Sequence, residues 1–428
     1  MTGQTQITET TFALTLALLM LAPLAIAGVA LINTGLGRSR SAAQSLLGSL
    51  GMISIAVIVF ALVGATWADG VSGTGHVLHF SGKPWNWAGT GPYFLQGLDT
   101  ETARNQLSLL FEFLAVALAV LIPWGSGADR LRLTAGASIA TVMAAFLFPF
   151  AAHWIWGGGW LAGLGKNFGL GAGFLDGGGA ATVHMLGGQA ALVVAWITGS
   201  RRGKFPKEGL STAMPGHNAV YVLFGCLVAL AGWLAWNLAG ALLWLNTAPE
   251  KLPIVAVNTF LAAAAALAAT FTVTRVRFGK PDASLCANGW LAGLVTSSAC
   301  AGIVSPLAAT FVGLVAGVAT PLLVEFLELA VSIDDPSGAI AAHAFSGLWG
   351  LAAAGLFAPA AGQFTAQLVG IATMLGLFLP LIYGLFLAVN RFVPFRVDSD
   401  GERIGMDLHE LGGGAYPEFV VHRDDSYR

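Results

Sequence analysis

Eleven stretches of this chain are long, apolar and nearly free of charged residues, and they limit the possible folds more than any other feature. A helix needs ~20 apolar residues to cross the hydrocarbon core of a bilayer. Over the whole chain, 56% of the residues are hydrophobic and 10% are charged, whereas soluble domains average about 25% charged residues. We therefore expect an all-α polytopic membrane protein with eleven transmembrane helices, at residues 11–34, 43–67, 106–124, 133–154, 177–199, 217–246, 254–274, 284–304, 307–331, 338–358 and 364–390.

The lysines and arginines of the connecting segments predict the orientation of these spans. If the N-terminus lies outside, the inner loops hold eleven basic residues and the outer loops hold four. Basic residues are enriched in cytoplasmic loops, so this distribution predicts an outer N-terminus and an inner C-terminus. Residues 1–390 then form one membrane domain, and the polar residues 391–428 form a cytoplasmic tail. The formal net charge of −2 gives no indication of a nucleic-acid partner.

One motif occurs twice, and each copy begins a predicted span. Asp176 precedes His184 by eight residues, and Gly188 follows four residues later. Asp335 and His343 repeat this D-x7-H-x3-G pattern. The first copy begins the fifth span and the second begins the tenth, and these two spans run in opposite directions. We therefore predict an inverted repeat of the first five spans and the next five, followed by an eleventh helix. Transporters built from such repeats bind their substrates near the midplane of the membrane.

The spacing within the motif places both histidines deep in the membrane. A helix rises about 1.5 Å per residue, so eight residues carry each histidine about 12 Å from the start of its helix, close to the ~15 Å depth of the midplane. Ionisable groups at that depth are costly and usually line a pathway, which favours a pore role for His184 and His343. The alternative is that each histidine only bridges neighbouring helices. Asp176 and Asp335 are suited to be helix N-caps that shape the site.

An intramembrane enzyme is a different interpretation of the same four residues, because two histidines and two aspartates could in principle hold a metal ion. The chain contains no H-x3-H or similar metal-binding spacing on these spans. We therefore predict a protein that is not an enzyme and that has neither a metal site nor a cofactor.

Several further motifs resemble the ammonium transporter/Rhesus family, most closely its ammonium transporter branch. They are AHWIWGGGWL, GWLAWNLAG, FGKPDASLCANGWLAGLV, DDPSGAIAAHAFSGLWG and GMDLHELGGGAY, and the resemblance covers nearly the whole chain. It implies homotrimers of eleven-span subunits in the cell (inner) membrane, each subunit with its own narrow pore. It also implies that His184 and His343 line this pore, and that ammonium is recruited outside, loses its proton and passes as ammonia. A cytosolic PII-type protein that blocks the inner mouth is a further implied partner.

The resemblance also implies a recruitment site at the outer mouth, made of a tryptophan, a serine and aromatic rings. The tryptophan matches Trp156, and an aromatic ring face attracts a cation by about 0.5–2 kcal/mol. The chain departs from the family at three other positions. Gly240 stands where the family has its serine, Trp236 replaces one gate phenylalanine, and the second gate phenylalanine falls on Ala115.

A carboxylate is the fourth departure. Phe111 and Glu112 match a Phe-Gln pair of the family, so the mouth gains a charge where it loses a hydroxyl and a ring. Glu112 either attracts ammonium by its charge, or is kept protonated or paired with a neighbouring helix. The altered mouth leaves two alternatives to ammonium transport open, a related channel with altered substrate selectivity and an ammonium sensor.

Overall fold

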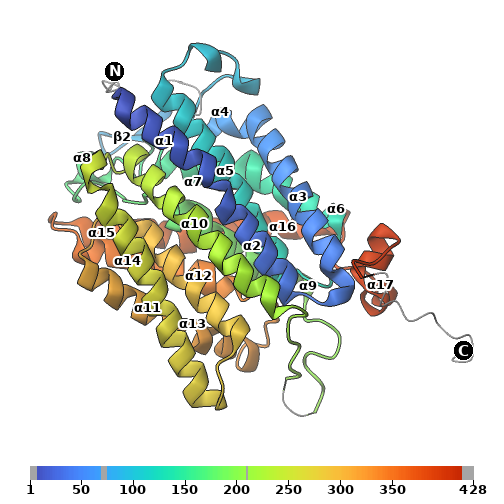
Figure 1. Ribbon diagram of the computed structural model, residues 1–428. Helices are drawn as coiled ribbons and strands as arrows, with labels where there is room; N and C mark the ends of the chain where they lie inside the picture. Colours follow the sequence, from blue (N-terminus) through green and yellow to red (C-terminus); the bar gives the residue numbers. More distant parts are fainter. Residues whose placement is uncertain (1–6, 69–74, 209–210, 417–428) are drawn as a thin grey trace, which may run out of the picture.

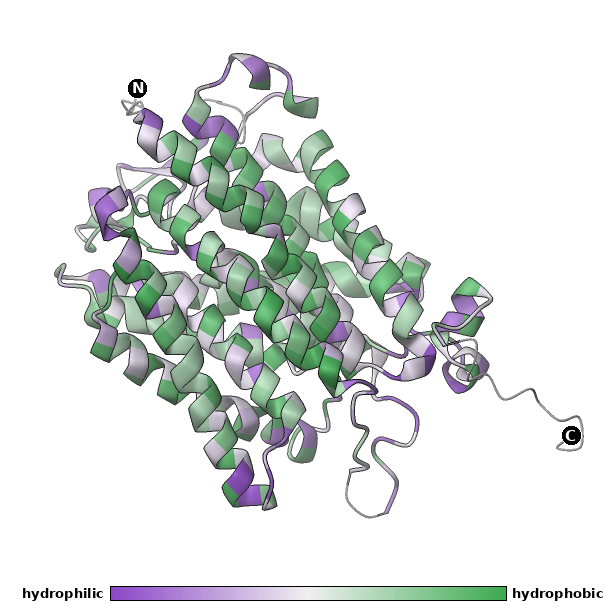
Figure 2. Cartoon of the chain, viewed as in Figure 1, coloured by the Kyte–Doolittle hydropathy of each residue, from purple (hydrophilic) through white to green (hydrophobic). Residues whose placement is uncertain are grey.

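The computed structural model describes residues 7–68, 75–208 and 211–416. Long helices cross one another obliquely in a single bundle (Figure 1). Apolar residues cover these helices, whereas hydrophilic residues gather at the helix ends and in the connections (Figure 2). Ten helices of the described ranges are long and apolar enough to cross a membrane. The chain is therefore a mostly helical, multi-pass membrane protein. The outermost parts of the predicted membrane domain and tail, residues 1–6 and 417–428, lie outside the described residues.

Every predicted span contains a helix. The first span consists of α1 (Glu9–Leu21) and α2 (Pro23–Leu36), which meet where Pro23 lacks the N–H needed to continue the backbone hydrogen bonds. The other long helices are α3 (Ala42–Val59), α5 (Ala103–Ser126), α6 (Leu133–Val142), α7 (Phe148–Ile155), α9 (Leu186–Thr198), α10 (Ala219–Leu243), α11 (Leu252–Phe278), α12 (Ala283–Cys300), α13 (Pro306–Leu329), α14 (Ser346–Phe357), α15 (Gln363–Thr373) and α16 (Leu379–Phe392). The short helices are α4 (Ala65–Ala68), α8 (Leu164–Phe168) and α17 (Ser399–Ile404).

Helix α12 is not among the ten apolar helices, although an eighth span was predicted there. It carries Asn288, Ser297 and Ser298, which lower its hydropathy, and it is buried from Cys286 to Cys300. Helices α10, α11, α13 and α14 pack around it. A helix enclosed by other helices needs little apolar surface towards lipid, which is why its composition differs. The number of eleven crossings and the orientation in the membrane stay predictions.

The connection between α4 and α5 contains a β-hairpin, so the prediction of an all-helical fold is wrong in this segment. β1 (His76–Phe80) pairs with β2 (Lys83–Ala88) in antiparallel register. Ser81 and Gly82 between them both have positive φ, at 50° and 73°, as two-residue hairpin turns require. We call the end of the bundle with this hairpin the hairpin end. The opposite end, where α2 ends and α17 lies, is the tail end (Figure 1).

Buried charges join the loops at the tail end. Arg201, after α9, pairs with Asp334 at 2.9 Å and with Asp129 at 3.2 Å. Arg130 donates to the backbone oxygen of Asp334 at 2.7 Å. Burial alone would raise the pKa of the Asp334 carboxyl, but the hydrogen bonds from Arg201 and the charges of both arginines hold this pKa below its usual value. This network ties the end of α9 to the segment that begins the second motif.

The segment after α16 folds back onto the same loops. The carboxylate of Asp407 accepts hydrogen bonds from the backbone N–H groups of Ala43 and Gln44, at 3.2 and 2.7 Å, at the start of α3. Glu410 accepts from the N–H of Leu133, the first residue of α6, at 2.8 Å. The first N–H groups of a helix have no partner within the helix. Carboxylates of the tail therefore cap two helices of its own chain.

Candidate functional site

Both motif histidines lie in π-helical segments, which the sequence pattern did not predict. His184 lies in η6 (Ala180–Met185) and His343 in η8 (Ile340–Phe345). Other π-helical segments lie elsewhere in the described chain, at η2 (Phe60–Gly64), η5 (Met143–Leu147), η9 (Met374–Phe378) and η10 (Asp407–Leu411). π-helical turns occur frequently at functional sites. The helix holding His184 also begins later than expected, at Ala180 rather than residue 177, because Gly179 has a φ of 80° and precedes the first turn.

An aspartate precedes each of these segments and binds its free N–H groups. The carboxylate of Asp176 accepts hydrogen bonds from three backbone N–H groups at the start of η6, at 2.5 to 3.0 Å. The carboxylate of Asp335 accepts from the N–H of Ile340, the first residue of η8, at 2.8 Å. Among the residues that the structure describes, neither carboxylate has a hydrogen bond or ion pair with an imidazole. This geometry suits a structural role that fixes where each histidine-bearing segment begins.

The two imidazoles meet in the interior of the bundle. Nδ1 of His343 lies 3.2 Å from Nδ1 of His184, and the two rings are nearly parallel, at 23°. His184 is 0% exposed and His343 is 3% exposed. The indole of Trp233 stacks on His184 with ring centroids 4.9 Å apart. Trp233 donates in turn to the hydroxyl of Ser298 at 2.9 Å, which holds the stack in place.

The Nδ1 contact determines what the pair offers to a small molecule. Two neutral imidazoles can share a hydrogen bond only if one Nδ1 carries the proton and the other accepts it. One ring therefore has a free lone pair at Nε2, and the other has an N–H there. Nε2 of His184 is buried and has no hydrogen-bond partner within the described ranges. The pair can thus both accept and donate a hydrogen bond in an apolar interior.

The glycines of the motif allow the two segments to cross. A Cβ on Gly188 would overlap the backbone nitrogen of Ala344, the residue after His343. A Cβ on Gly347 would overlap the backbone oxygen of Ala180 at the start of η6, at 2.5 Å. Each copy of the motif therefore contacts the other through its own glycine, one helical turn beyond its own histidine. This reciprocal contact holds the imidazoles within hydrogen-bonding distance.

Four aromatic rings lie together near the segment that carries the first motif. Phe111 contacts Trp156, Trp236 and Trp244 with ring centroids 5.4, 4.6 and 5.8 Å apart. Trp156 and Trp244 stack in parallel at 5.0 Å. The indole N–H of Trp156 donates to the backbone oxygen of Asp176 at 2.6 Å. The ring cluster is thus attached to the segment that carries the first motif.

Comparison with known proteins identifies the family of this chain. Residues 11–416 match the family model described as the Ammonium Transporter Family. The chain belongs to the ammonium transporter family. This membership confirms the resemblance seen in the sequence motifs. Ammonium transporter Amt2 of Archaeoglobus fulgidus is 31% identical over 415 residues, which are 92% of this chain and 85% of the relative. An ammonium transporter of Bacillus subtilis is 30% identical over 408 residues, covering 91% of this chain and 94% of the relative.

Solved structures share the fold of this family member. A structure described as Sensor Amt Protein matches with a TM-score of 0.84 at 24% identity, over 94% of this chain and 98% of the other. Mep2 of Candida albicans matches with a TM-score of 0.78 at 23% identity, over 97% of this chain and 92% of the other. The helical architecture is therefore that of known Amt and Mep2 structures.

The ring cluster of this family member contains one residue that sequence reasoning missed. Trp244 follows the last residue of α10 and lies one helical turn beyond Gly240 and two beyond Trp236. The spacing of four and eight residues places Trp236, Gly240 and Trp244 on one face of the helix. This spacing could have identified Trp244 from the sequence. Trp244 adds an indole to the cluster, whereas Ala115, which the resemblance aligns with a gate phenylalanine, is buried and adds no ring.

Glu112 and Gly240 are the other two positions at which the resemblance implies a departure from the family pattern. Glu112 is buried, with 4% of its surface exposed. Consecutive helical residues are rotated by about 100°, so its side chain leaves α5 on a different face from Phe111. Gly240 packs against the motif: a Cβ there would overlap the backbone oxygen of Gly177. The chain therefore has no room for the serine that the resemblance aligns with this position.

Restoring that serine is expected to damage the protein rather than tighten binding. Gly240→Ser should lower stability by about 1–3 kcal/mol, because its Cβ must displace backbone atoms. The unfolding midpoint of purified protein measures the loss of stability, and the apparent affinity for ammonium shows whether binding becomes tighter. Gly384→Ser is the matched control, because a Cβ at Gly384 meets nothing within 4 Å. Tighter ammonium binding by Gly240→Ser at an unchanged midpoint would contradict the steric explanation.

Proposed function

We propose that this chain transports ammonium by recruiting it at the hairpin end, removing its proton and conducting ammonia past His184 and His343. The observation that carries the proposal is the buried contact between the two Nδ1 atoms. A bare cation is costly to bury in an apolar site, whereas a neutral molecule that is hydrogen-bonded is not. The lone pair at one Nε2 and the N–H at the other suit a neutral nitrogen that both donates and accepts. Imidazoles are also able to carry the released proton.

Recruitment is the proposed role of the ring cluster of Trp156, Trp236, Trp244 and Phe111. Ring faces attract cations by about 0.5–2 kcal/mol, and three indoles offer larger faces than the phenylalanines of the family pattern. In this proposal Trp244 supplies the ring that is missing at Ala115. The cluster meets the first motif at the backbone oxygen of Asp176, where Trp156 donates its N–H. Ammonium captured there would next encounter the path towards His184.

Glu112 follows Phe111 of this cluster in α5, although its side chain leaves the helix on a different face, and it is the proposed source of negative charge near the outer mouth. Glu112→Gln keeps the size of the side chain, restores the residue of the family and removes the charge. We expect the apparent affinity for ammonium to fall about three- to tenfold, because desolvation offsets most of an attraction of roughly 4 kcal/mol. Selectivity should stay unchanged, since the histidines set it. The concentration dependence of the ammonium-induced current in proteoliposomes measures the affinity, and currents with potassium and sodium measure the selectivity.

The control for this variant is Glu9→Gln at the start of α1, which removes an exposed carboxylate from the same end of the bundle. It should leave affinity unchanged, because exposed charges are screened within about 10 Å at 0.1 M salt. An unaltered affinity in Glu112→Gln would show that Glu112 is structural, and recruitment would then rest on the rings alone.

The arrangement in the membrane is also part of the proposal. We place the hairpin end outside and the tail end inside, with eleven crossings built from an inverted repeat and an eleventh helix, in the cell (inner) membrane. The reciprocal contacts of Gly188 and Gly347 support the repeat, because symmetry-related segments meet through equivalent residues. We further propose a PII-type regulator at the inner mouth, a partner that the family resemblance implies.

A homotrimer with one pore in each subunit is the expected assembly. Native mass spectrometry of protein extracted in a gentle detergent should give a mass of three chains. A stable monomer or dimer under these conditions would count against the trimer. The pore proposal would survive that result, since the histidine pair lies within one chain.

An ammonium current in proteoliposomes tests the main proposal. Purified protein should give a saturable current or an uptake of ammonium and methylammonium that empty vesicles lack. Two rival functions predict other results. A channel with altered selectivity would conduct a different small solute, and a sensor would bind ammonium without conducting it. The fold shared with Sensor Amt Protein and the altered ring cluster are the observations that favour including the sensor in this test.

A further inference from the structure

Two consecutive serines of α12, Ser297 and Ser298, are buried and present hydrogen-bond acceptors to α10. Each hydroxyl donates its proton to the backbone oxygen of Leu294 in its own helix, at 2.6 and 3.2 Å. A hydroxyl has one proton and two lone pairs, so both serines accept hydrogen bonds from other helices and donate none to them. α12 therefore holds two fixed oxygen acceptors inside the bundle.

The two acceptors serve different donors of α10. Ser298 accepts from the indole N–H of Trp233 at 2.9 Å, and Ser297 accepts from the side-chain amide of Asn237 at 2.9 Å. The same amide also donates to the hydroxyl of Thr259 in α11, at 3.0 Å. Asn237 therefore keeps an acceptor when Ser297 is lost. Within the described ranges of the chain, the indole N–H of Trp233 has no acceptor other than Ser298.

Ser298 also connects the histidine pair to the ring cluster. Its backbone oxygen accepts from the N–H of Gly178 at 2.7 Å. The backbone oxygen of Gly178 accepts in turn from the indole N–H of Trp236, at 2.8 Å. On the other side, the Trp233 that the hydroxyl holds is stacked on His184. The hydroxyl of Ser298 thus supports the imidazole stack, whereas its backbone supports the ring cluster.

We propose that Ser298 is a positioning residue for ammonium conduction, because its hydroxyl holds Trp233 against His184. The inference rests on the proposed function. A buried indole N–H without an acceptor is costly, so loss of the hydroxyl favours another position of Trp233 in which its N–H finds a partner. His184 then loses the ring face that keeps it nearly parallel to His343. The backbone oxygen that binds Gly178 stays, since a change of side chain does not remove it.

Ser298→Ala is expected to affect conduction without affecting recruitment. The maximal ammonium current in proteoliposomes should fall about tenfold, the equivalent of ~1.4 kcal/mol, and selectivity over potassium should fall with it. The ammonium concentration that gives half of the maximal current should stay that of the wild type, because the ring cluster keeps its support through Gly178. A residue that only stabilised the bundle would not separate these two quantities.

Ser297→Ala is the matched control. It removes the neighbouring hydroxyl, which makes the same donation to the backbone oxygen of Leu294. It should keep the current and the selectivity of the wild type, because Asn237 still donates to Thr259.

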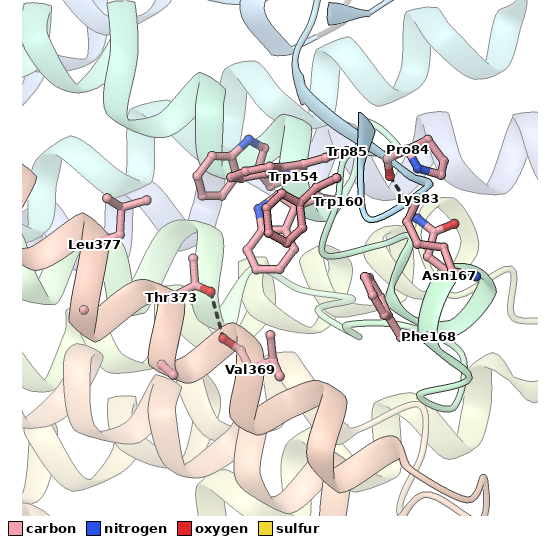
Figure 3. A pocket seen from close by; sticks show the side chains of 13 residues that line it. Lys83, Pro84, Trp85, Trp154, Trp160, Asn167, Phe168, Val369, Thr373 and Leu377 are labelled. Atoms are coloured by element: carbon pink, nitrogen blue, oxygen red, sulfur yellow. Dashed lines mark hydrogen bonds between the residues drawn. The ribbon is translucent and has the colours of Figure 1, made fainter. Parts of the chain in front are cut away.

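A second control removes a hydroxyl at a distant site. An apolar groove of about 560 Å³ lies on the surface of the bundle at the hairpin end (Figure 3). Thr373 lines this groove and donates to the backbone oxygen of Val369 in its own helix, at 2.8 Å. Neither Ser298 nor Trp233 lines the groove. Thr373→Ala should therefore leave the current unchanged.

A double-mutant cycle tests whether the serine acts through the indole. Trp233→Phe keeps an aromatic ring but removes the N–H. Residues that share one hydrogen bond have non-additive effects, so Ser298→Ala should cause no further loss of current in a Trp233→Phe background. Losses that multiply would overturn the proposal. An unchanged current in Ser298→Ala alone would overturn it as well.

The stack itself can be followed without any transport. In protein containing isotope-labelled histidine, the stacked indole of Trp233 shifts the ring-proton signal of His184, which is identified by its absence in His184→Ala. Ser298→Ala should move this signal towards that of an unstacked histidine, and Ser297→Ala should leave it in place. An unmoved signal in Ser298→Ala would overturn the inference. A wild-type protein without ammonium current would contradict the proposed function instead, and the signal would still decide whether Ser298 holds the stack.

Discussion

Alanine in place of His184 or of His343 is expected to abolish selective ammonium conduction. Each substitution removes one partner of the 3.2 Å contact between the Nδ1 atoms and leaves an apolar hole without a hydrogen-bonding ring. A positioned proton donor or acceptor contributes roughly 10²–10⁴-fold to a rate, so we expect the current to fall by about 100-fold or more. Where a current persists, it should no longer distinguish ammonium from other cations. Currents in proteoliposomes with ammonium, potassium and sodium measure both effects.

His79→Ala is the control for these variants, because His79 lies in the exposed strand β1, away from the pair. Its current should match that of the wild type. Assembly of every variant is checked by size-exclusion elution, so that a lost current is not confused with a lost fold. Normal rate and selectivity in both alanine variants would show that the two histidines only join neighbouring helices, the alternative that the sequence left open.

Alanine at Gly188 is expected to act nearly as strongly, without touching either imidazole. The added methyl group would overlap the backbone nitrogen of Ala344, so the helix must move away from η8. Overpacking of this kind costs about 1–3 kcal/mol, and the displacement separates the two rings. We expect a lower unfolding midpoint together with a large loss of ammonium current. Gly347→Ala should behave in the same way, because its methyl group would overlap the backbone oxygen of Ala180.

Gly384→Ala provides the comparison for both glycine variants. It lies in α16, and a Cβ there meets nothing within 4 Å. Alanine in an exposed helix is favoured over glycine by roughly 0.5–1 kcal/mol, so its midpoint should stay equal or rise slightly. If Gly188→Ala keeps both the midpoint and the current of the wild type, the crossing of the two motif segments does not depend on glycine.

These contacts explain why the repeated motif contains an aspartate, a histidine and a glycine at a fixed spacing. The aspartate binds the first N–H groups of a π-helical segment, the histidine turns inward from that segment, and the glycine lets the other segment approach. A chain that keeps the histidines but loses the glycines would hold the same chemical groups too far apart. Residue types alone therefore do not bring the two imidazoles together; their spacing along two crossing helices does.

The sequence alone determined where the long apolar helices lie and which two histidines meet inside the bundle. Every predicted span contains a helix, because the length and apolar character of a membrane segment are properties of consecutive residues. The pairing of His184 with His343 was also predictable, since one motif occurs at the start of two spans. The hairpin from residue 76 to residue 88 was not predicted, because its strands lack the alternation of a half-buried sheet.

Only the tertiary structure decided how these residues meet. The Nδ1 contact joins residues 159 positions apart, and its distance depends on the angle at which two helices cross. Trp244 likewise contacts residues of other segments, Trp156 and Phe111. Gly240 packs against the backbone of Gly177, which also lies far away in the sequence. The physical reason is that interiors are packed to atomic contact. Whether a ring or a hydroxyl fits at one position is therefore set by the atoms of distant segments, which a local pattern does not contain.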